Sequence, residues 1–99
     1  MVKHLVMWKL KEKGEAGQTA AARMKTAIEA LSSVIPEIKE IEVGINFGRS
    51  DQASDVSLYS VFANEADLQT YLKHPAHLEV VQMVRELVSE RRVVDYLAE

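Results

Sequence analysis

The chain has 99 residues, a net charge of −3 and no cysteine. Its length suits one domain spanning residues 1–99, and 47% hydrophobic with 27% charged residues is typical of an ordinary globular domain. The missing cysteine excludes disulfides, thiolate metal sites and a cysteine nucleophile, and it suits the cytoplasm, where we expect the protein. The acidic balance argues against a nucleic-acid partner, and no apolar run is long enough for a membrane span.

Residues 2–10 alternate in the manner of a β-strand. Leu5 and Met7 point to one face, and the other face carries Val2, His4, Val6, Trp8 and Leu10. Both faces are apolar in the middle, so we expect helices to cover one and a second copy of the chain to cover the other. His4 is therefore either a satisfied core histidine or a residue that lines a pocket.

Residues 11–18 are mostly charged or polar and contain two glycines, which predicts a loop. From Thr19 to Val34, apolar residues recur at spacings of three and four, as an amphipathic helix requires, and Pro36 ends the pattern. Met24 lies on the apolar face of this helix, where it either fills the core or borders a pocket.

Three further strands are predicted by alternation, at residues 38–47, 56–63 and 91–98, with a polar loop at residues 48–55. Asn64 is placed to cap a helix that follows the third strand. The order strand, helix, strand, strand, helix pair, strand predicts an α+β, ferredoxin-like βαββαβ fold. A second identical sheet packed on the bare face would give a dimeric α+β barrel, and hence a homodimer.

The segment Tyr71-Leu72-Lys73-His74-Pro75-Ala76-His77 interrupts the helix pair. Proline disfavours helical geometry in the residue before it and is well placed to open a new helix, so one helix should end near Lys73 and the next should run to about Ser89. His77 then lies in the first turn, where the helix dipole favours a neutral imidazole that can act as a base. The alternative is a helix corner whose histidines only satisfy nearby backbone groups.

These motifs together resemble the stress-responsive A/B barrel domain (Dabb) family of small dimeric proteins. The resemblance is carried by Val-Lys-His at residues 2–4, by Tyr71-x-x-His74-Pro75-x-His77 and by Asp95 with Tyr96 in the closing strand. It implies that Tyr71 and His77 match the catalytic pair of a plant polyketide cyclase of this family. It also implies a pocket between sheet and helices, which we expect to be lined by His4, Val6, Trp8, Met24, Ile28, Leu58, His74, Val80 and Asp95.

The resemblance leaves two functional classes open. One is a binding or stress-protective homodimer with a small hydrophobic ligand. The other is a cofactor-free enzyme of polyketide cyclase or monooxygenase type, in which His77 removes a proton and Tyr71 holds the histidine or the oxyanion. The aromatic residues that shape the cyclase pocket are replaced near Met24, Ile28 and Val88, which argues against the cyclase's own substrate.

A metal site is the rival explanation for three histidines. His74 and His77 are three residues apart, which suits ligands on one helix face, but Pro75 breaks the helix between them and no acidic third ligand is adjacent. We therefore expect no metal and no cofactor. The remaining expectation is that Asp95 pairs with His4 across neighbouring antiparallel strands and orients its imidazole, the alternative being an idle aspartate at the sheet edge.

Overall fold

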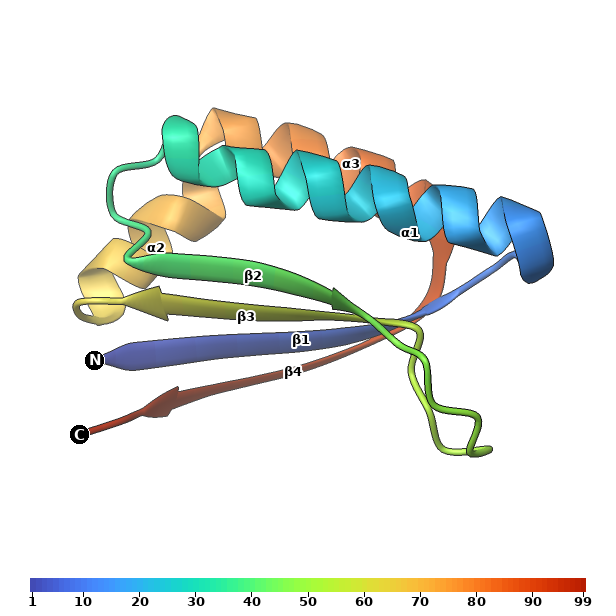
Figure 1. The fold of residues 1–99 in the computed structure, drawn as a ribbon. Helices are drawn as coiled ribbons and strands as arrows, with labels where there is room; N and C mark the ends of the chain where they lie inside the picture. The colour runs from blue at the N-terminus through green and yellow to red at the C-terminus, as the bar shows by residue number, and fades with distance from the viewer.

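One antiparallel sheet carries all four strands of the chain, and the computed structural model describes all 99 residues. The strands are β1 (Val2–Leu10), β2 (Glu40–Ile45), β3 (Val56–Phe62) and β4 (Val88–Leu97), arranged in the order β2-β3-β1-β4. The helices are α1 (Gly14–Glu29), α2 (Glu65–Lys73) and α3 (Pro75–Leu87), with a short 3₁₀ helix at Ala30–Ser33. Figure 1 shows the helices on one side of the sheet and both termini at the same end, which confirms the predicted ferredoxin-like fold.

The strand register divides the sheet into two chemically different faces. His4 lies opposite Ser60 of β3 and Asp95 of β4, and Val6 lies opposite Leu58 and Val93. Because side chains alternate across a strand, these residues all point toward the helices. In β1 this face consists of Val2, His4, Val6, Trp8 and Leu10, which are all buried as predicted.

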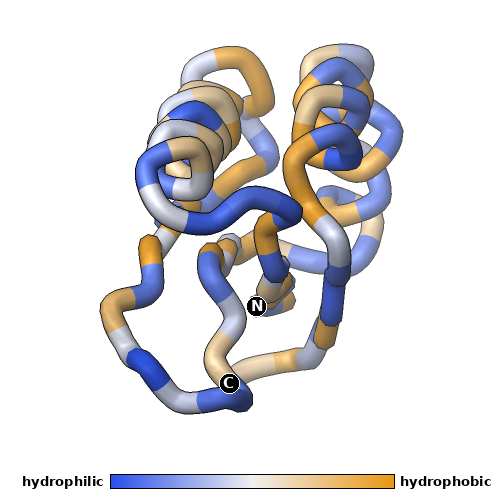
Figure 2. The backbone as a smooth tube through the Cα atoms, turned by 90° about the vertical axis from the view of Figure 1, so that its right-hand side faces the viewer, coloured by the Kyte–Doolittle hydropathy of each residue, from blue (hydrophilic) through white to orange (hydrophobic).

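The hydrophobic core lies between this face and the helices. Its larger part joins the centre of the sheet to α1 and α3, and a smaller part lies under α2 around Phe62 and Tyr71. Figure 2 shows the two longer helices side by side above the strands, with hydrophobic and hydrophilic residues alternating along each helix. Such alternation buries one stripe of each helix and leaves the other in water.

The first helix begins earlier than predicted. It starts at Gly14 rather than near Thr19, so residues 14–18, expected in a loop, are helical. Gly14 has φ = +62°, a conformation that suits glycine at the entry to the helix. A Cβ atom on Gly17 would lie 2.6 Å from the carbonyl oxygen of Glu12, so the second glycine permits close packing and does not interrupt the helix.

The limits of other elements also differ from the prediction, and β4 begins at Val88 instead of residue 91. The second strand is shorter than the predicted residues 38–47. Phe47, the last residue of that predicted strand, is 97% exposed in the loop that extends away from the helices (Figure 1). The last helix ends at Leu87 instead of about Ser89, because the chain is already extended at Val88, where β4 begins. The 3₁₀ turn at Ala30–Ser33 completes what was predicted as one helix to Val34.

The outer edge of the sheet at β2 is tied to α1. The Lys25 Nζ donates to the carbonyl oxygen of Val43 at 2.6 Å and to Glu29 at 2.8 Å. The Glu29 carboxylate in turn accepts from the backbone N–H of Val43 at 3.0 Å. The hydrogen bond from Lys25, followed by that from Val43, lowers the pKa of Glu29. Both outward-facing backbone groups of this edge residue are therefore satisfied by one helix turn.

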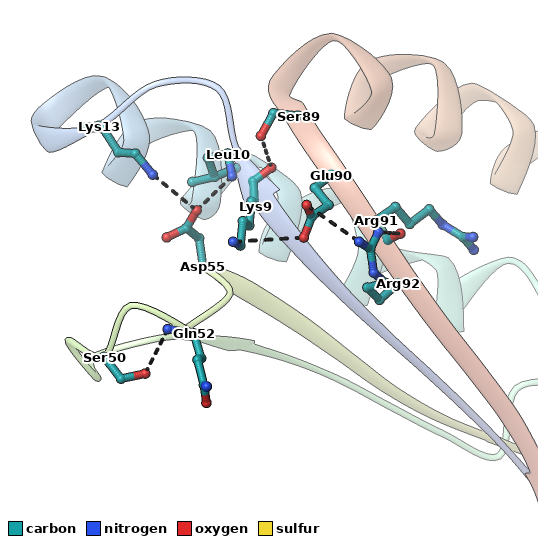
Figure 3. A network of polar contacts seen from close by, with 10 residues as sticks. All are labelled: Lys9, Leu10, Lys13, Ser50, Gln52, Asp55, Ser89, Glu90, Arg91 and Arg92. Atoms are coloured by element: carbon teal, nitrogen blue, oxygen red, sulfur yellow. Dashed lines mark hydrogen bonds and ion pairs between the residues drawn. The ribbon is translucent and has the colours of Figure 1, made fainter.

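A second polar network joins the loop before β3 to the ends of β1 and β4 (Figure 3). The Asp55 carboxylate accepts from the backbone N–H of Leu10 at 2.7 Å and lies 3.9 Å from the Lys13 ammonium. Lys9 and Glu90 form a longer pair across β1 and β4. These contacts fix the end of the sheet where α3 turns into β4.

The face opposite the helices remains partly apolar. Met7 is 48% exposed, Val94 50% and Tyr96 43%, and the register places all three on this face. Val61, which strand alternation predicts on this face and in contact with a second copy, is already buried within the single chain and offers little surface to a partner. The apolar surface on this face is therefore concentrated on β1 and β4.

Candidate functional site

The break between α2 and α3 is formed as the sequence predicts. His74 is extended, with φ = −65° and ψ = 135°, and Pro75 begins the next helix. The His74 Nδ1 accepts a hydrogen bond from the backbone N–H of Ala76 at 3.0 Å, so this histidine caps α3. The capping geometry places His77 in the first turn, facing back toward the end of α2.

A cavity of about 320 Å³ lies between the sheet and the helices. This volume is at the lower end of the range for small-molecule sites. Six elements contribute to its lining, which consists of His4, Val6, Trp8, Ile28, Leu58, Tyr71, His77, Val80, Val81, Val84, Arg85, Val88 and Arg91. Most of these side chains are hydrophobic, and no aspartate or glutamate is among them.

Tyr71 and His77 meet in this cavity. Their ring centroids are 4.3 Å apart, and Tyr71 also packs against Phe62 at 5.0 Å. The His77 Nδ1 lies 3.1 Å from the carbonyl oxygen of Leu72. Since a carbonyl can only accept, Nδ1 must carry the proton, and in the neutral ring Nε2 keeps its lone pair. This tautomer is the one that a general base requires.

The environment holds both groups in their neutral forms. Burial raises the pKa of Tyr71 to about 12, with the Arg91 guanidinium opposing part of this effect. Burial is the main cause that lowers the pKa of His77, and the charges of His4, Arg91 and His74 lower it further. The hydrogen bond to the Leu72 carbonyl acts in the opposite direction and raises it. At neutral pH Tyr71 is therefore a proton donor and His77 a proton acceptor.

The Tyr71 hydroxyl is available to a ligand. It makes no side-chain hydrogen bond within the chain, and no buried polar side-chain atom lacks a partner. The hydroxyl therefore reaches the cavity that Tyr71 lines, although the residue as a whole is only 1% exposed. A donor in this position can hydrogen-bond an oxygen atom of a bound molecule.

His4 and Asp95 form the pair expected from antiparallel register. They lie directly opposite each other on β1 and β4, and the His4 Nδ1 is hydrogen-bonded to the Asp95 carboxylate. The His4 ring is buried, whereas the Asp95 side chain is 43% exposed. The Nδ1 atom is held by Asp95, so Nε2 is the ring nitrogen left free. His4 lines the cavity, and its ring centroid is 6.1 Å from that of Tyr71.

The cavity brings together eight of the residues expected at the site: His4, Val6, Trp8, Ile28, Leu58, Tyr71, His77 and Val80. Three others lie beside it. Met24 is fully buried in the core, His74 caps α3, and Asp95 reaches the site through His4.

Sequence reasoning did not assign the lining residues Val81, Val84, Arg85 and Arg91, and it named Val88 only as a position where the resemblance loses an aromatic residue. Two signals pointed to the arginines. Arg85 lies eight residues after His77 and four after Val81, which places them on one helix face. Arg91 lies opposite Trp8 in the register of β4, on the helix side of the sheet. The structure contains no group of three or more histidine, aspartate or glutamate side chains that could hold a metal ion.

The family of the chain follows from sequence comparison. The model of the stress responsive A/B barrel domain matches residues 2–98. The chain belongs to this family. The Dabb chain is 36% identical to a protein from Bacteroides fragilis NCTC 9343, described as a dimeric protein of unknown function with a ferredoxin-like fold. The match covers 96% of this chain and 93% of that one, with a TM-score of 0.86.

Two more distant structures share the fold. Hydroxynitrile lyase from Passiflora edulis is 20% identical, with a TM-score of 0.84 over 99% of the Dabb chain and 93% of its own. A Dabb family protein from Mesorhizobium loti MAFF303099 is 19% identical, with a TM-score of 0.81 over 99% and 96%. No curated protein sequence matches the chain significantly. In this Dabb chain, no helix combines the length and apolar character needed to cross a bilayer.

Proposed function

We propose that this protein is a homodimer that binds a small hydrophobic ligand between its sheet and its helices. The observation that carries the proposal is the cavity of about 320 Å³, which has a mostly apolar lining and a few convergent polar groups. Ligand sites typically combine these two properties, since apolar contact supplies affinity and polar groups fix orientation. We assign Tyr71, His77 and His4 to ligand binding because they lie on this lining. The cytoplasm is the compartment that we propose for the protein.

The dimer is supported by the face opposite the helices. Met7, Val94 and Tyr96 are large, apolar and about half exposed there, and a second copy is the occupant that symmetry favours. The relative from Bacteroides fragilis is described as dimeric. We expect such an interface to bury more than about 1,000 Å² in total.

Binding can be tested with the only tryptophan as the reporter. Trp8 lines the cavity, so a ligand that enters should change its fluorescence. A screen of small hydrophobic compounds should give saturable hits, and Val81→Phe should weaken them by filling the cavity. Gln82→Phe is the matched control, since residue 82 is exposed on the same helix. The proposal fails if no compound saturates, or if both variants bind as the wild type does.

A second candidate function is acid–base catalysis without a cofactor. It is favoured by the tautomer of His77, whose Nε2 is free to take a proton while Nδ1 is held by Leu72. In such a reaction, Nε2 would remove a proton from carbon next to a carbonyl group, and the Tyr71 hydroxyl would donate a hydrogen bond to the developing enolate oxygen. Polyketide cyclisation by aldol addition begins with a carbanion of this type, which then attacks a second carbonyl carbon of the same molecule.

Proton abstraction can be measured directly. NMR would follow deuterium uptake next to the carbonyl group of 2-nonanone in D₂O, with and without protein. An active protein should accelerate exchange, His77→Ala should remove the acceleration, and Tyr71→Phe should reduce it by about a hundredfold. Equal exchange with the wild type and His77→Ala would exclude this chemistry for simple ketones and leave the binding function as the sole proposal.

A further inference from the structure

Two arginines border a cavity that contains no acidic side chain. Arg85 of α3 and Arg91 of β4 both contribute to its lining and are both exposed, so they lie at its rim, above buried residues such as Val6 and Leu58. They flank the junction at Val88, where α3 ends and β4 begins. One end of an otherwise apolar site therefore carries two permanent positive charges.

Neither guanidinium is neutralised within the chain. The ion pairs of the structure involve other cations, and no side-chain hydrogen bond starts from the guanidinium of Arg85 or Arg91. In Figure 3 the Arg91 side chain extends away from Glu90 and Arg92, and no contact is drawn at its guanidinium. The neighbouring Arg92, by contrast, lies 3.7 Å from the Glu90 carboxylate.

The positive charge also reaches the inner part of the cavity. The Arg91 guanidinium lowers the pKa of both Tyr71 and His77, so its field extends to these groups. Together with two histidines and one tyrosine hydroxyl, the lining offers several hydrogen-bond donors and no anion. Arginine is the residue best suited to hold a carboxylate, because its planar fork matches the two oxygens.

We propose that the ligand of this cavity is an amphipathic organic acid, whose apolar body occupies the buried part while its carboxylate is held at the rim by Arg85 and Arg91. This inference rests on the proposed binding function and specifies the class of ligand. The floor of Val6, Ile28 and Leu58 suits an alkyl or aryl group. The apolar body alone would bind weakly, since the two arginines would lose water without gaining a partner.

The test compares three probes that share one apolar chain: octanoate, octan-1-ol and octylammonium. Titrations at pH 7.5 and low salt would follow Trp8 fluorescence. We expect octanoate to bind at least about tenfold more tightly than octan-1-ol, the factor that one charge-assisted contact supplies. Octylammonium should bind more weakly than the alcohol, because both arginines repel it.

Variants assign the selectivity to individual residues. Arg85→Gln and Arg91→Gln should each weaken octanoate binding by about threefold or more, and together they should remove the preference over octan-1-ol. Arg92→Gln is the matched control, since its side chain lies on the opposite face of the same strand and should leave octanoate affinity unchanged. Saturable binding of octan-1-ol should persist in every variant, which shows that the cavity is intact.

The outcomes separate this inference from the function on which it rests. Equal affinity for octanoate and octan-1-ol would overturn the acid class and leave the hydrophobic pocket in place. If Arg92→Gln weakened octanoate binding as much as the other two variants do, the preference for octanoate would depend only on the net charge of the protein. That result would also overturn the inference. If none of the three probes binds, the acid class fails for this chain length, and the wider compound screen decides the binding function independently.

Discussion

Replacement of Tyr71 by phenylalanine tests how deeply the proposed donor is buried. Its ring packs against Phe62 and His77, and Phe preserves these contacts. Its hydroxyl has no hydrogen-bond partner within the chain, so removal leaves no unsatisfied group. At pH 8 we therefore expect Tyr71→Phe to change the free energy of unfolding by no more than about 0.5 kcal/mol.

At high pH the two proteins should diverge. Burial raises the pKa of Tyr71 from 10.0 to about 12, so the folded state keeps a proton that the unfolded state loses. The resulting stability is complete below pH 10 and is lost as the pH rises through about 12. Two pKa units correspond to about 2.7 kcal/mol, of which about 1.4 kcal/mol is lost by about pH 11. Tyr71→Phe has no phenol to ionise and should not show this loss.

Urea unfolding at fixed protein concentration, repeated from pH 8 to 11, measures the difference. Subtracting the variant from the wild type removes the contribution of every other titrating group. Tyr96→Phe is the matched control, because it removes a phenol from the opposite face of the sheet and leaves Tyr71, with its loss of stability toward pH 11, in place. A difference in unfolding free energy between wild type and Tyr71→Phe that stays constant over this range would mean that burial does not raise the pKa of Tyr71.

Three further predictions concern the pair on β1 and β4, the dimer and the acid side of the stability curve. A double-mutant cycle with His4→Gln and Asp95→Asn should give a coupling energy above about 0.5 kcal/mol, whereas additive effects would mean that the hydrogen bond contributes nothing. Met7→Glu should convert a dimer into a folded monomer in sedimentation experiments, because Met7 is 48% exposed in the single chain; a dimer unaffected by this charge would place the interface elsewhere. Since burial lowers the pKa of His77, stability should fall as the pH drops below 6.5, and His77→Gln should reduce that fall in chemical unfolding curves.

Periodicity predicted the central strands well because β1 and β3 bury alternate residues against the helices. The alternation of residues 2–10 fixed the direction of His4, and the antiparallel order then placed it opposite Asp95. The limits of the elements were less predictable, because glycine can either interrupt a helix or allow it to start and to pack closely, depending on its surroundings. Gly14 and Gly17 suggested a loop, yet the first supports a left-handed entry into the helix and the second allows the backbone of Glu12 to approach.

The site was predictable where a residue acts through local geometry. Pro75 dictated the helix break, and the break alone placed His77 in a first turn. The arginines were harder to assign, because an exposed charge at a helix end usually faces only water. Arg91 contributes to the cavity only because β4 begins directly after α3 and lies beside β1, a relationship between distant parts of the chain.

The clamp of Lys25 and Glu29 on Val43 has a consequence for how the protein associates with other chains. An extended segment that added itself to β2 would need the backbone groups of Val43, which the clamp already occupies. The opposite edge of the sheet, β4, has no neighbouring strand and no such clamp. Strand addition is thus hindered at β2 and unobstructed at β4, which works against extension of the sheet from both sides into a continuous fibre.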